Sequence, residues 1–132
     1  MNKEYKTKHH IKYSCKYYII FCPKYRRKVL DNGIDSYLKE AIPAIAKEYN
    51  CEVIEMEVMP DHVHILIEID PDYSVLDIVR HIKRKTARGT KDTFPYMEKR
   101  LPNIWTRSSF ISSVGGAPLE VIEQYIENQK NV

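Results

Sequence analysis

Two alternating segments separated by a proline turn constrain the fold of this chain more than any other feature. In both segments, 51–59 and 62–70, apolar residues occupy every second position. They are Ile54, Met56 and Val58 in the first segment and Val63, Ile65, Ile67 and Ile69 in the second. A period of two is typical of strands with one buried face. Because only Pro60-Asp61 separates the segments, we predict an antiparallel hairpin.

The first half of the chain supplies another strand and a helix. Residues 10–22 are rich in β-branched and aromatic residues and end at Pro23, so we predict a strand. In residues 34–49 apolar and aromatic residues recur every three or four positions, which is the spacing of one helical face. Pro43 lies inside this segment and lacks a backbone donor, so it is expected to kink or loosen the helix.

A second helix is predicted after Ser74. Ser74 is a good N-cap and Asp77 follows in the first turn, where a negative charge favours a helix. The inward residues of this helix are Val75, Val79 and Ile82. The basic run 83–85 is expected at its end, and residues 90–103, which contain two prolines, are expected to be irregular.

The C-terminal part is predicted to add one strand and one helix. A short strand around Phe110 and Ile111 is expected to end at Gly115-Gly116. A final helix then begins near Pro118, a residue favoured in the first helical turn. Its inward side chains are Leu119, Ile122 and Ile126.

The predicted order is strand, helix, strand, strand, helix, strand, helix. This order is the split βαβ plan of a ferredoxin-like (RRM-like) fold in the α+β class, with an antiparallel sheet and helices on one face. The other face is expected to be open, and a C-terminal helix carries Tyr125. Residues 1–132 contain no repeat or long linker and suit a single domain.

Composition excludes several classes of protein. No stretch approaches the roughly 20 apolar residues that a membrane helix needs. The basic start of the chain lacks the apolar segment of a signal peptide. The three cysteines form no CxxC pair, which favours reduced thiols over a disulfide frame or a zinc knuckle. We therefore expect a cytoplasmic protein with no membrane partner.

The net charge of +3 hides a strong pattern along the chain. Residues 1–30 hold nine Lys or Arg against one acid, residues 31–79 hold two against twelve, and residues 80–107 hold nine against two. Clustered basic residues attract phosphates, and the ten tyrosines offer ring faces on which unpaired bases can stack. A solvated mixed surface explains the same charges, but the dense basic runs favour a nucleic-acid partner.

His62 and His64 lie two residues apart on a predicted strand, so their imidazoles project to the same side. Two neighbouring imidazoles can bind one divalent ion. This spacing is more often explained by two histidines on a solvated strand surface. A third metal ligand and a nucleophile are needed to favour a metal-dependent active site instead.

The last predicted helix offers both groups. Tyr125 and Gln129 are four residues apart, so they share one helical face. The carbonyl oxygen of Gln129 can bind a hard metal ion, and Tyr125 lies beside the apolar stripe of the helix. A packing tyrosine and a solvated glutamine explain the same two residues.

Five sequence motifs follow one another along nearly the whole chain. They are YIIFCPKYRRKVL, MPDHVHILIEI, SVLDIVRHIKRKTAR, IWTRSSFISSVGG and YIENQ. In this order they resemble the small single-tyrosine HUH transposases of the insertion-sequence 200/605 type. The chain departs from that family at two positions. Relatives often carry a histidine where this chain has Tyr18, and many carry an aromatic residue where it has Ser109.

The resemblance implies an enzyme that cleaves and rejoins single-stranded DNA at insertion-sequence ends and recognises subterminal DNA hairpins. It implies that Tyr125 is the nucleophile. The metal ligands that it implies are His62, His64 and Gln129, with Mg²⁺ as the ion, although imidazole ligands suit Mn²⁺ better. It also implies a homodimer, in which the tyrosine helix of one subunit often completes the site of the other.

The resemblance further implies that two basic segments contact DNA. Their residues are Lys24, Tyr25, Arg26, Arg27, Lys28, Arg80, Lys83, Arg84, Lys85 and Arg88.

The implied reaction is a transesterification. The phenolate attacks phosphorus, a 5′-phosphotyrosine forms and a 3′-hydroxyl leaves, so rejoining needs no nucleotide cofactor. A tyrosine has a pKa near ~10, so little phenolate is present at neutral pH. A divalent ion would polarise the phosphate and stabilise charge in the transition state. Asp61 and Glu68 are near enough in sequence to tune such a site.

Other classes of protein explain parts of the sequence. A repeat-associated (domesticated) HUH tyrosine endonuclease is the nearest, and the lack of a helicase segment argues against a replication nickase. A non-catalytic nucleic-acid-binding module of ferredoxin-like fold explains the basic runs but gives no reason for the four candidate site residues. A zinc hydrolase explains the histidine pair, with Glu68 or Asp70 as a further ligand.

Overall fold

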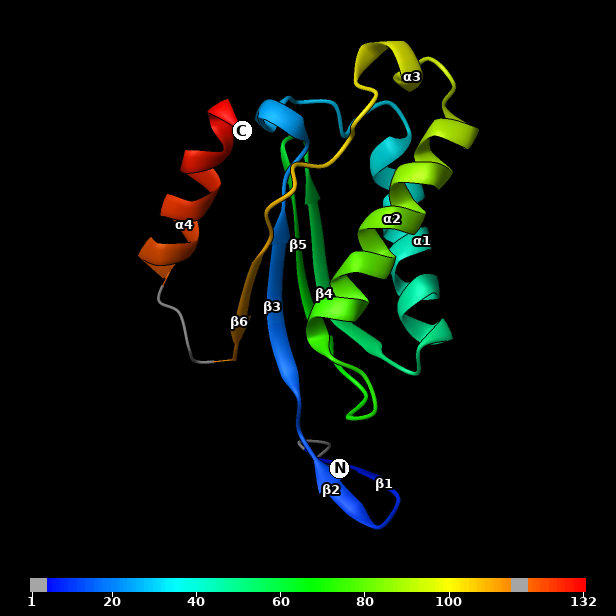
Figure 1. The fold of residues 1–132 in the computed structure, drawn as a ribbon, viewed down its shortest axis with the longest axis vertical. Coiled ribbons are helices and arrows are strands. Elements are labelled where there is room, and N and C mark those ends of the chain that lie inside the picture. Colours follow the sequence, from blue (N-terminus) through cyan, green and yellow to red (C-terminus); the bar gives the residue numbers. More distant parts are fainter. Residues whose placement is uncertain (1–4, 115–118) are drawn as a thin grey trace.

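The main sheet has four antiparallel strands in the order β4-β5-β3-β6. The computed structural model describes residues 5–114 and 119–132. Its sheet strands are β3 (Lys16–Phe21), β4 (Glu52–Met59), β5 (His62–Glu68) and β6 (Phe110–Ser113). The long helices α1 (Ile34–Glu48) and α2 (Val75–Thr93) lie on one side of this sheet (Figure 1). This confirms the predicted ferredoxin-like α+β arrangement.

The main core lies between the sheet and these two helices. Ile19 and Ile65 from the central strands are fully buried there, as are Leu38 and Ile42 of α1. α1 is continuous through Pro43. The buried residues on both sides of the proline hold the helix on the sheet, and this packing offsets the lost backbone donor.

The predicted hairpin of β4 and β5 is confirmed, with Met59 opposite His62 across the two-residue turn. One predicted position is wrong. The register shifts between Val53 and Glu55, so Ile54 is the extra residue of a β-bulge. Ile54 therefore faces solvent with 43% of its surface exposed, and Val53 packs against the core instead.

The predicted strand 10–22 is divided in two. Its first part, β2 (Ile11–Tyr13), pairs with β1 (Lys6–Lys8) in a separate two-stranded hairpin beyond the end of the main sheet (Figure 1). Lys8 of this hairpin contacts Asp70, which is fully buried. Glu68 is also buried and accepts a hydrogen bond from the backbone N–H of Cys15. Strand alternation from His62 and His64 would place Glu68 and Asp70 on the open face of the sheet, but both acids are buried.

α2 begins as predicted, because the Ser74 hydroxyl accepts a hydrogen bond from the Asp77 N–H at 3.1 Å. The helix does not end at the basic run 83–85. Its buried stripe continues through Thr86 and Thr90, so it extends to Thr93. The expected irregular region also contains a short helix, α3 (Met97–Arg100).

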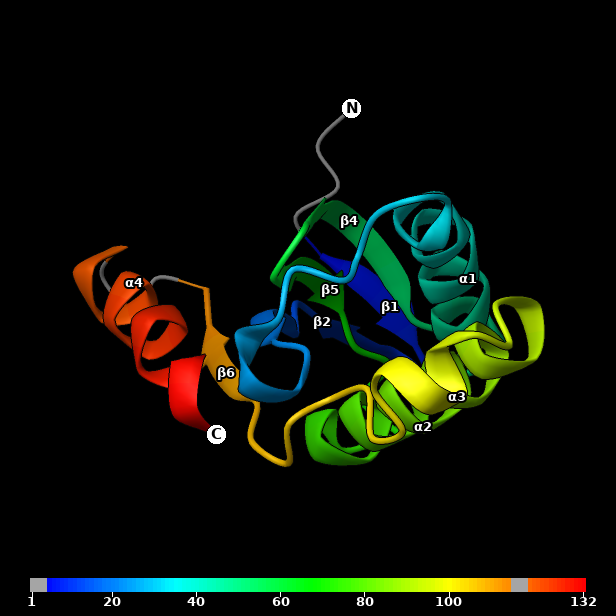
Figure 2. The ribbon, with the colours of Figure 1, turned by 90° about the horizontal axis from the view of Figure 1, so that it is seen from above.

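The C-terminal helix α4 (Leu119–Glu127) lies beside β6, on the other side of the sheet from α1 and α2 (Figure 2). It continues into the short helix η2 (Asn128–Asn131). Ile20 and Cys22 of the central strand region are fully buried outside the main core, so the second face is not wholly open.

The predicted boundaries at Gly115-Gly116 and Pro118, and the side chain of Leu119, lie outside the described residues. Cys15, Cys22 and Cys51 are free thiols, as predicted. Within the described part of the chain, no helix is long and apolar enough to cross a membrane.

Candidate active site

The histidine pair projects from β5 toward the second face of the sheet. Val63 and Ile65 point into the main core and are fully buried, so His62 and His64 point the opposite way. His64 pairs with Ile20 of β3 on one side and with Glu57 of β4 on the other. The same face carries Tyr18, whose ring centroid lies 5.6 Å from that of His64.

His64 is suited to act as a metal ligand. Burial lowers the pKa of its imidazole, so the ring is neutral at pH 7 and retains a free lone pair. Its Nε2 atom is buried, and within the described residues it has no hydrogen-bond partner. A buried nitrogen without a partner costs about 1–3 kcal/mol. A cation at this atom would supply the missing partner.

His62 is oriented by the turn that precedes it. Its Nδ1 atom lies 2.9 Å from Asp61 Oδ1, so the tautomer that donates to this carboxylate leaves Nε2 free to bind a cation. The other Asp61 oxygen lies 3.1 Å from Nε of Arg26. Arg26 also contacts Glu127 Oε2 at 3.1 Å, at the end of α4. The histidine strand and the tyrosine helix are thus joined through one arginine.

Tyr125 and Gln129 meet at a residue that the sequence did not single out. Ser108 Oγ lies 3.0 Å from the Tyr125 hydroxyl and donates to Gln129 Oε1 at 2.8 Å. Gln129 is only 6% exposed. The ring of Tyr125 packs on Phe110 of β6 at a centroid distance of 5.4 Å. The predicted shared helical face of Tyr125 and Gln129 is therefore turned toward the sheet.

Tyr125 is not activated in this arrangement. Burial raises the pKa of its phenol above the ordinary value of a tyrosine. The phenol is therefore protonated at neutral pH and needs a further group to act as a nucleophile.

The two halves of the candidate site lie side by side on the second face without touching. Ile20 pairs with His64 on one side and with Phe110, the packing partner of Tyr125, on the other. Two strand spacings, about 10 Å, separate the backbone of His64 from that of Phe110. Within residues 5–114 and 119–132, no hydrogen bond joins either imidazole to Tyr125 or Gln129.

The donor set fits a divalent cation. Two imidazole nitrogens lie on this face of the sheet, and the orphaned His64 Nε2 is the strongest sign of a cation site. The amide oxygen of Gln129 lies on the same face and accepts a hydrogen bond from Ser108, which a cation would have to replace. In the described residues no three His, Cys, Asp or Glu side chains gather as a metal site. The zinc hydrolase that the sequence left open lacks its further ligand, because Glu68 and Asp70 are engaged by Cys15 and Lys8.

The first predicted DNA-binding run surrounds the short helix η1 (Lys24–Arg26). Tyr25 is half exposed, and Lys24 and Arg27 lie 5.5 and 6.0 Å from its ring centroid. Arg27 and Lys28 are exposed. Arg26 instead points inward, where it contacts Asp61 and the end of α4.

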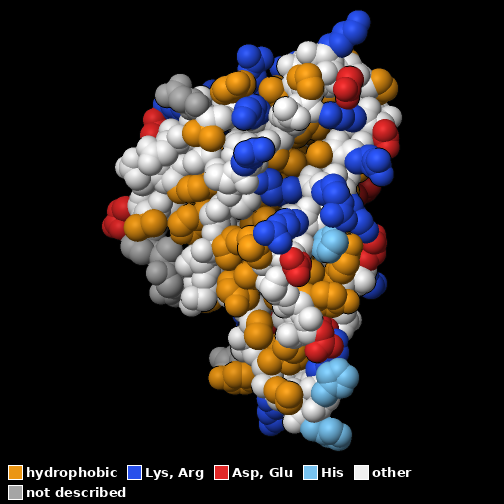
Figure 3. All heavy atoms as spheres, in the orientation of Figure 1, with side chains coloured by type: hydrophobic (Ala, Val, Ile, Leu, Met, Phe, Trp, Pro, Cys, Tyr) orange, Lys and Arg blue, Asp and Glu red, His pale blue; other side chains and the backbone are white. Residues whose placement is uncertain are grey.

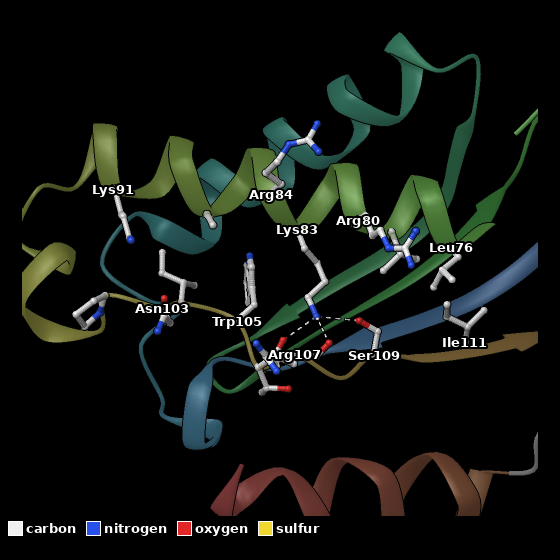
Figure 4. A pocket seen from close by; sticks show the side chains of 15 residues that line it. Leu76, Arg80, Lys83, Arg84, Lys91, Asn103, Trp105, Arg107, Ser109 and Ile111 are labelled. Atoms are coloured by element: carbon white, nitrogen blue, oxygen red, sulfur yellow. Dashed lines mark hydrogen bonds between the residues drawn. The ribbon is translucent and has the colours of Figure 1, made fainter. Parts of the chain in front are cut away.

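Three residues of the second predicted DNA-binding segment, Arg80, Lys83 and Arg84, line one side of a basic cleft of about 600 Å³ between α2 and residues 102–111 (Figure 4). Its basic lining residues are Arg80, Lys83, Arg84, Lys91 and Arg107. Among the described residues that line it, none is acidic. Lys and Arg side chains gather over this part of the surface (Figure 3). Arg88 is exposed, whereas Lys85 is paired with Glu48 at 2.8 Å.

Lys83 has an internal role within this cleft. Its ammonium donates to the carbonyl oxygens of Thr106 and Ser108 at 2.8 and 2.9 Å, and to Ser109 Oγ at 2.9 Å (Figure 4). These bonds leave it less available to a phosphate than its exposed neighbours.

Lys83 gives a testable pH dependence of stability. Burial lowers the pKa of its ammonium from 10.5 to about 8. Between these values the unfolded chain holds a proton that the folded chain has lost, so this group adds stability as the pH rises. We expect wild type to gain stability relative to Lys83→Met between about pH 8 and pH 10. Urea unfolding at several pH values measures this, and a constant or falling difference contradicts it.

Comparison with known proteins identifies the family. The family model for IS200-like transposases matches residues 11–129, and the chain belongs to this family. The ISDra2 transposase TnpA of Deinococcus radiodurans is 37% identical over 119 residues, which cover 89% of this chain and 85% of that one. The transposase for insertion sequence element IS200 of Salmonella typhimurium is 29% identical over 122 residues, covering 91% and 80%.

Solved structures agree with this assignment. The structure of a proposed transposase from Deinococcus radiodurans R1 matches with a TM-score of 0.85 and 30% identity, over 96% of this chain and 99% of that one. A REP-associated tyrosine transposase shares the fold with a TM-score of 0.59 and 17% identity, over 96% of this chain and 69% of that one. Cleavage and transfer of DNA strands is the activity that membership of a transposase family implies.

Proposed function

We propose that this protein is a transposase that cleaves and rejoins single-stranded DNA at insertion-sequence ends through a 5′-phosphotyrosine on Tyr125. The observation that carries the proposal is the position of the Tyr125 hydroxyl. It is held by Ser108 on the face of the sheet to which the orphaned His64 nitrogen also points. The family supports strand transfer as the reaction, and the phenol of Tyr125 is a nucleophile that this face offers.

Each residue has a distinct part in this reaction. The oxygen of Tyr125 forms a bond to phosphorus while the bond from phosphorus to the 3′-oxygen breaks, and that oxygen leaves as a hydroxyl. Rejoining reverses these bonds, so the energy of the ester is kept. Ser108 orients the phenol, and Asp61 and Arg26 orient His62 and the end of α4. A small movement of α4 would bring the phenol to a phosphate beside the imidazoles.

His62, His64 and Gln129 would hold a divalent cation, Mg²⁺ or Mn²⁺. When bound, such an ion supplies positive charge that polarises the phosphate and stabilises the transition state. Two neutral imidazoles and an amide do not neutralise that charge, which favours an anionic substrate.

The partner in this proposal is single-stranded DNA with hairpin ends, bound by a homodimer. The exposed basic residues around Tyr25 and along α2 supply charge for the phosphate backbone. A tyrosine transposase of the same fold is described as bound to a REP hairpin, which supports hairpin recognition here.

The test uses wild-type protein and single-stranded oligonucleotides that carry the hairpins and flanks of candidate element ends. With Mn²⁺ or Mg²⁺, we expect the label of a 3′-labelled strand to become covalently attached to protein. The label of a 5′-labelled strand should be released on a fragment with a 3′-hydroxyl. Attachment of the 5′ label, or equal cleavage of the fully duplex form, contradicts the proposal.

A further inference from the structure

One serine connects the two candidate functional groups of the C-terminal helix. The hydroxyl of Ser108 lies 3.0 Å from the Tyr125 hydroxyl and 2.8 Å from Gln129 Oε1. It also lies 3.0 Å from the hydroxyl of Thr106, which accepts a hydrogen bond from the Ser108 N–H at 3.1 Å. Polar atoms from two segments distant in sequence thus meet at a single oxygen.

The number of protons at this oxygen decides the direction of each bond. Gln129 Oε1 carries no proton, so that bond exists only if Ser108 donates its single proton. The contact with Tyr125 then requires the phenol to donate to Ser108. The phenol proton therefore points to Ser108, and the lone pairs of the phenol oxygen remain free.

Ser108 is a rigid point of attachment because it is held from the other side of its segment. Lys83 of α2 donates to the carbonyl oxygens of Thr106 and Ser108 and to Ser109 Oγ. In Figure 4 Lys83 extends from α2 to this segment, and α4 lies on the segment's far side. The position of Ser108 is therefore fixed by contacts that do not involve α4.

We infer that Ser108 is a positioning residue that holds the Tyr125 hydroxyl and the Gln129 amide through one shared hydroxyl group. The inference rests on the proposed function, in which Tyr125 is the nucleophile and Gln129 a ligand. Ser108 can donate to Gln129 or to the phenol oxygen, but not to both. Once Gln129 Oε1 is engaged elsewhere, the Ser108 proton is free to turn to the Tyr125 oxygen. The phenol then releases its own proton to solvent as the leaving 3′-oxygen takes one up, and the Ser108 proton stabilises the phenolate. The Ser108 proton therefore couples two events, the binding of the Gln129 amide to another group and the activation of Tyr125.

The first test compares Ser108→Ala with Ser108→Thr, which keeps the hydroxyl. Ser112→Ala is the matched control, because the Ser112 hydroxyl is exposed and donates to the Ser113 carbonyl. In single-turnover adduct formation we expect Ser108→Ala to be slower by about 10–100-fold, as for other residues that orient catalytic groups. Hairpin affinity and melting temperature should stay near wild type, and Ser108→Thr should recover most of the rate.

The second test uses the protein without metal or DNA. The side-chain amide signals of Gln129 in a ¹⁵N NMR spectrum should move in Ser108→Ala and stay in place in Ser112→Ala. If Ser108→Ala does not fold, Ser108→Cys, which keeps the size but is a weak donor, is measured in the same way.

A wild-type adduct rate in Ser108→Ala together with unmoved Gln129 signals would overturn the inference. Failure of the proposed function has a different signature, since wild type would then form no adduct or Tyr125→Phe would form one. The Gln129 signals still test the Ser108 contact in that case.

Discussion

Tyr125→Phe is expected to lower covalent attachment to DNA by at least about 1,000-fold, the scale of losing a nucleophile. Phenylalanine keeps the ring that packs on Phe110 but lacks the oxygen that would attack phosphorus. Binding of hairpin DNA should remain close to wild type, because the exposed basic residues around Tyr25 and α2 are unchanged. A suicide oligonucleotide and a denaturing gel measure the adduct, and a gel-shift titration measures binding.

Tyr18→Phe is the matched control for this variant. Tyr18 lies on the same face of the sheet and its ring centroid is 5.6 Å from that of His64, so it is the tyrosine most able to compete for the role. We expect Tyr18→Phe to keep adduct formation. An adduct in Tyr125→Phe, or its loss in Tyr18→Phe alone, would refute the assignment of the nucleophile.

His64→Ala is expected to reduce cleavage more than about 100-fold, beyond the loss typical of residues that only support a metal ligand. The buried Nε2 of His64 lacks a partner among the described residues, and burial keeps the imidazole neutral by lowering its pKa. Both features indicate that His64 is a metal ligand and not a histidine with only a structural role. His62→Ala should act in the same direction, and hairpin binding should persist in both variants.

Calorimetric titration with Mn²⁺ measures the metal affinity that each histidine variant loses. Cleavage by wild type should fall in the same way when excess chelator removes the metal. His81→Ala is the control, because His81 of α2 stacks on Tyr49 at 4.4 Å and belongs to the other side of the molecule. Undiminished cleavage by His64→Ala in the presence of a chelator would remove the metal from the mechanism.

Local patterns in the sequence predicted most of the fold. The period of two gave the hairpin of β4 and β5, and Ser74 marked the start of α2. The bulge at Ile54 could not be predicted, because it depends on how one strand pairs with its neighbour. The burial of Asp70 depends on Lys8, which is more than 60 residues away and belongs to a hairpin that the sequence did not reveal.

The sequence also predicted part of the candidate site, namely the residues whose positions follow from strand or helix periodicity. Strand periodicity places both imidazoles on one face, and helical spacing turns Tyr125 and Gln129 to the same side. Ser108 was not predictable, because its contacts with α4 span about 20 residues of chain and serine follows no spacing rule. The inward direction of Arg26 and Lys83 was missed for the same reason, since their acceptors, Asp61 and the carbonyl oxygen of Ser108, come from distant parts of the chain.

The central claim is that Tyr125 and Gln129 come to the same cation as the histidine pair, within one subunit or between two. The most direct test is paramagnetic broadening by Mn²⁺ of the side-chain NMR signals of Tyr125 and Gln129, with hairpin DNA bound. Strong broadening of both signals, lost in His64→Ala, is the predicted result. Sharp signals from both residues while Mn²⁺ is bound at the histidines would contradict the claim.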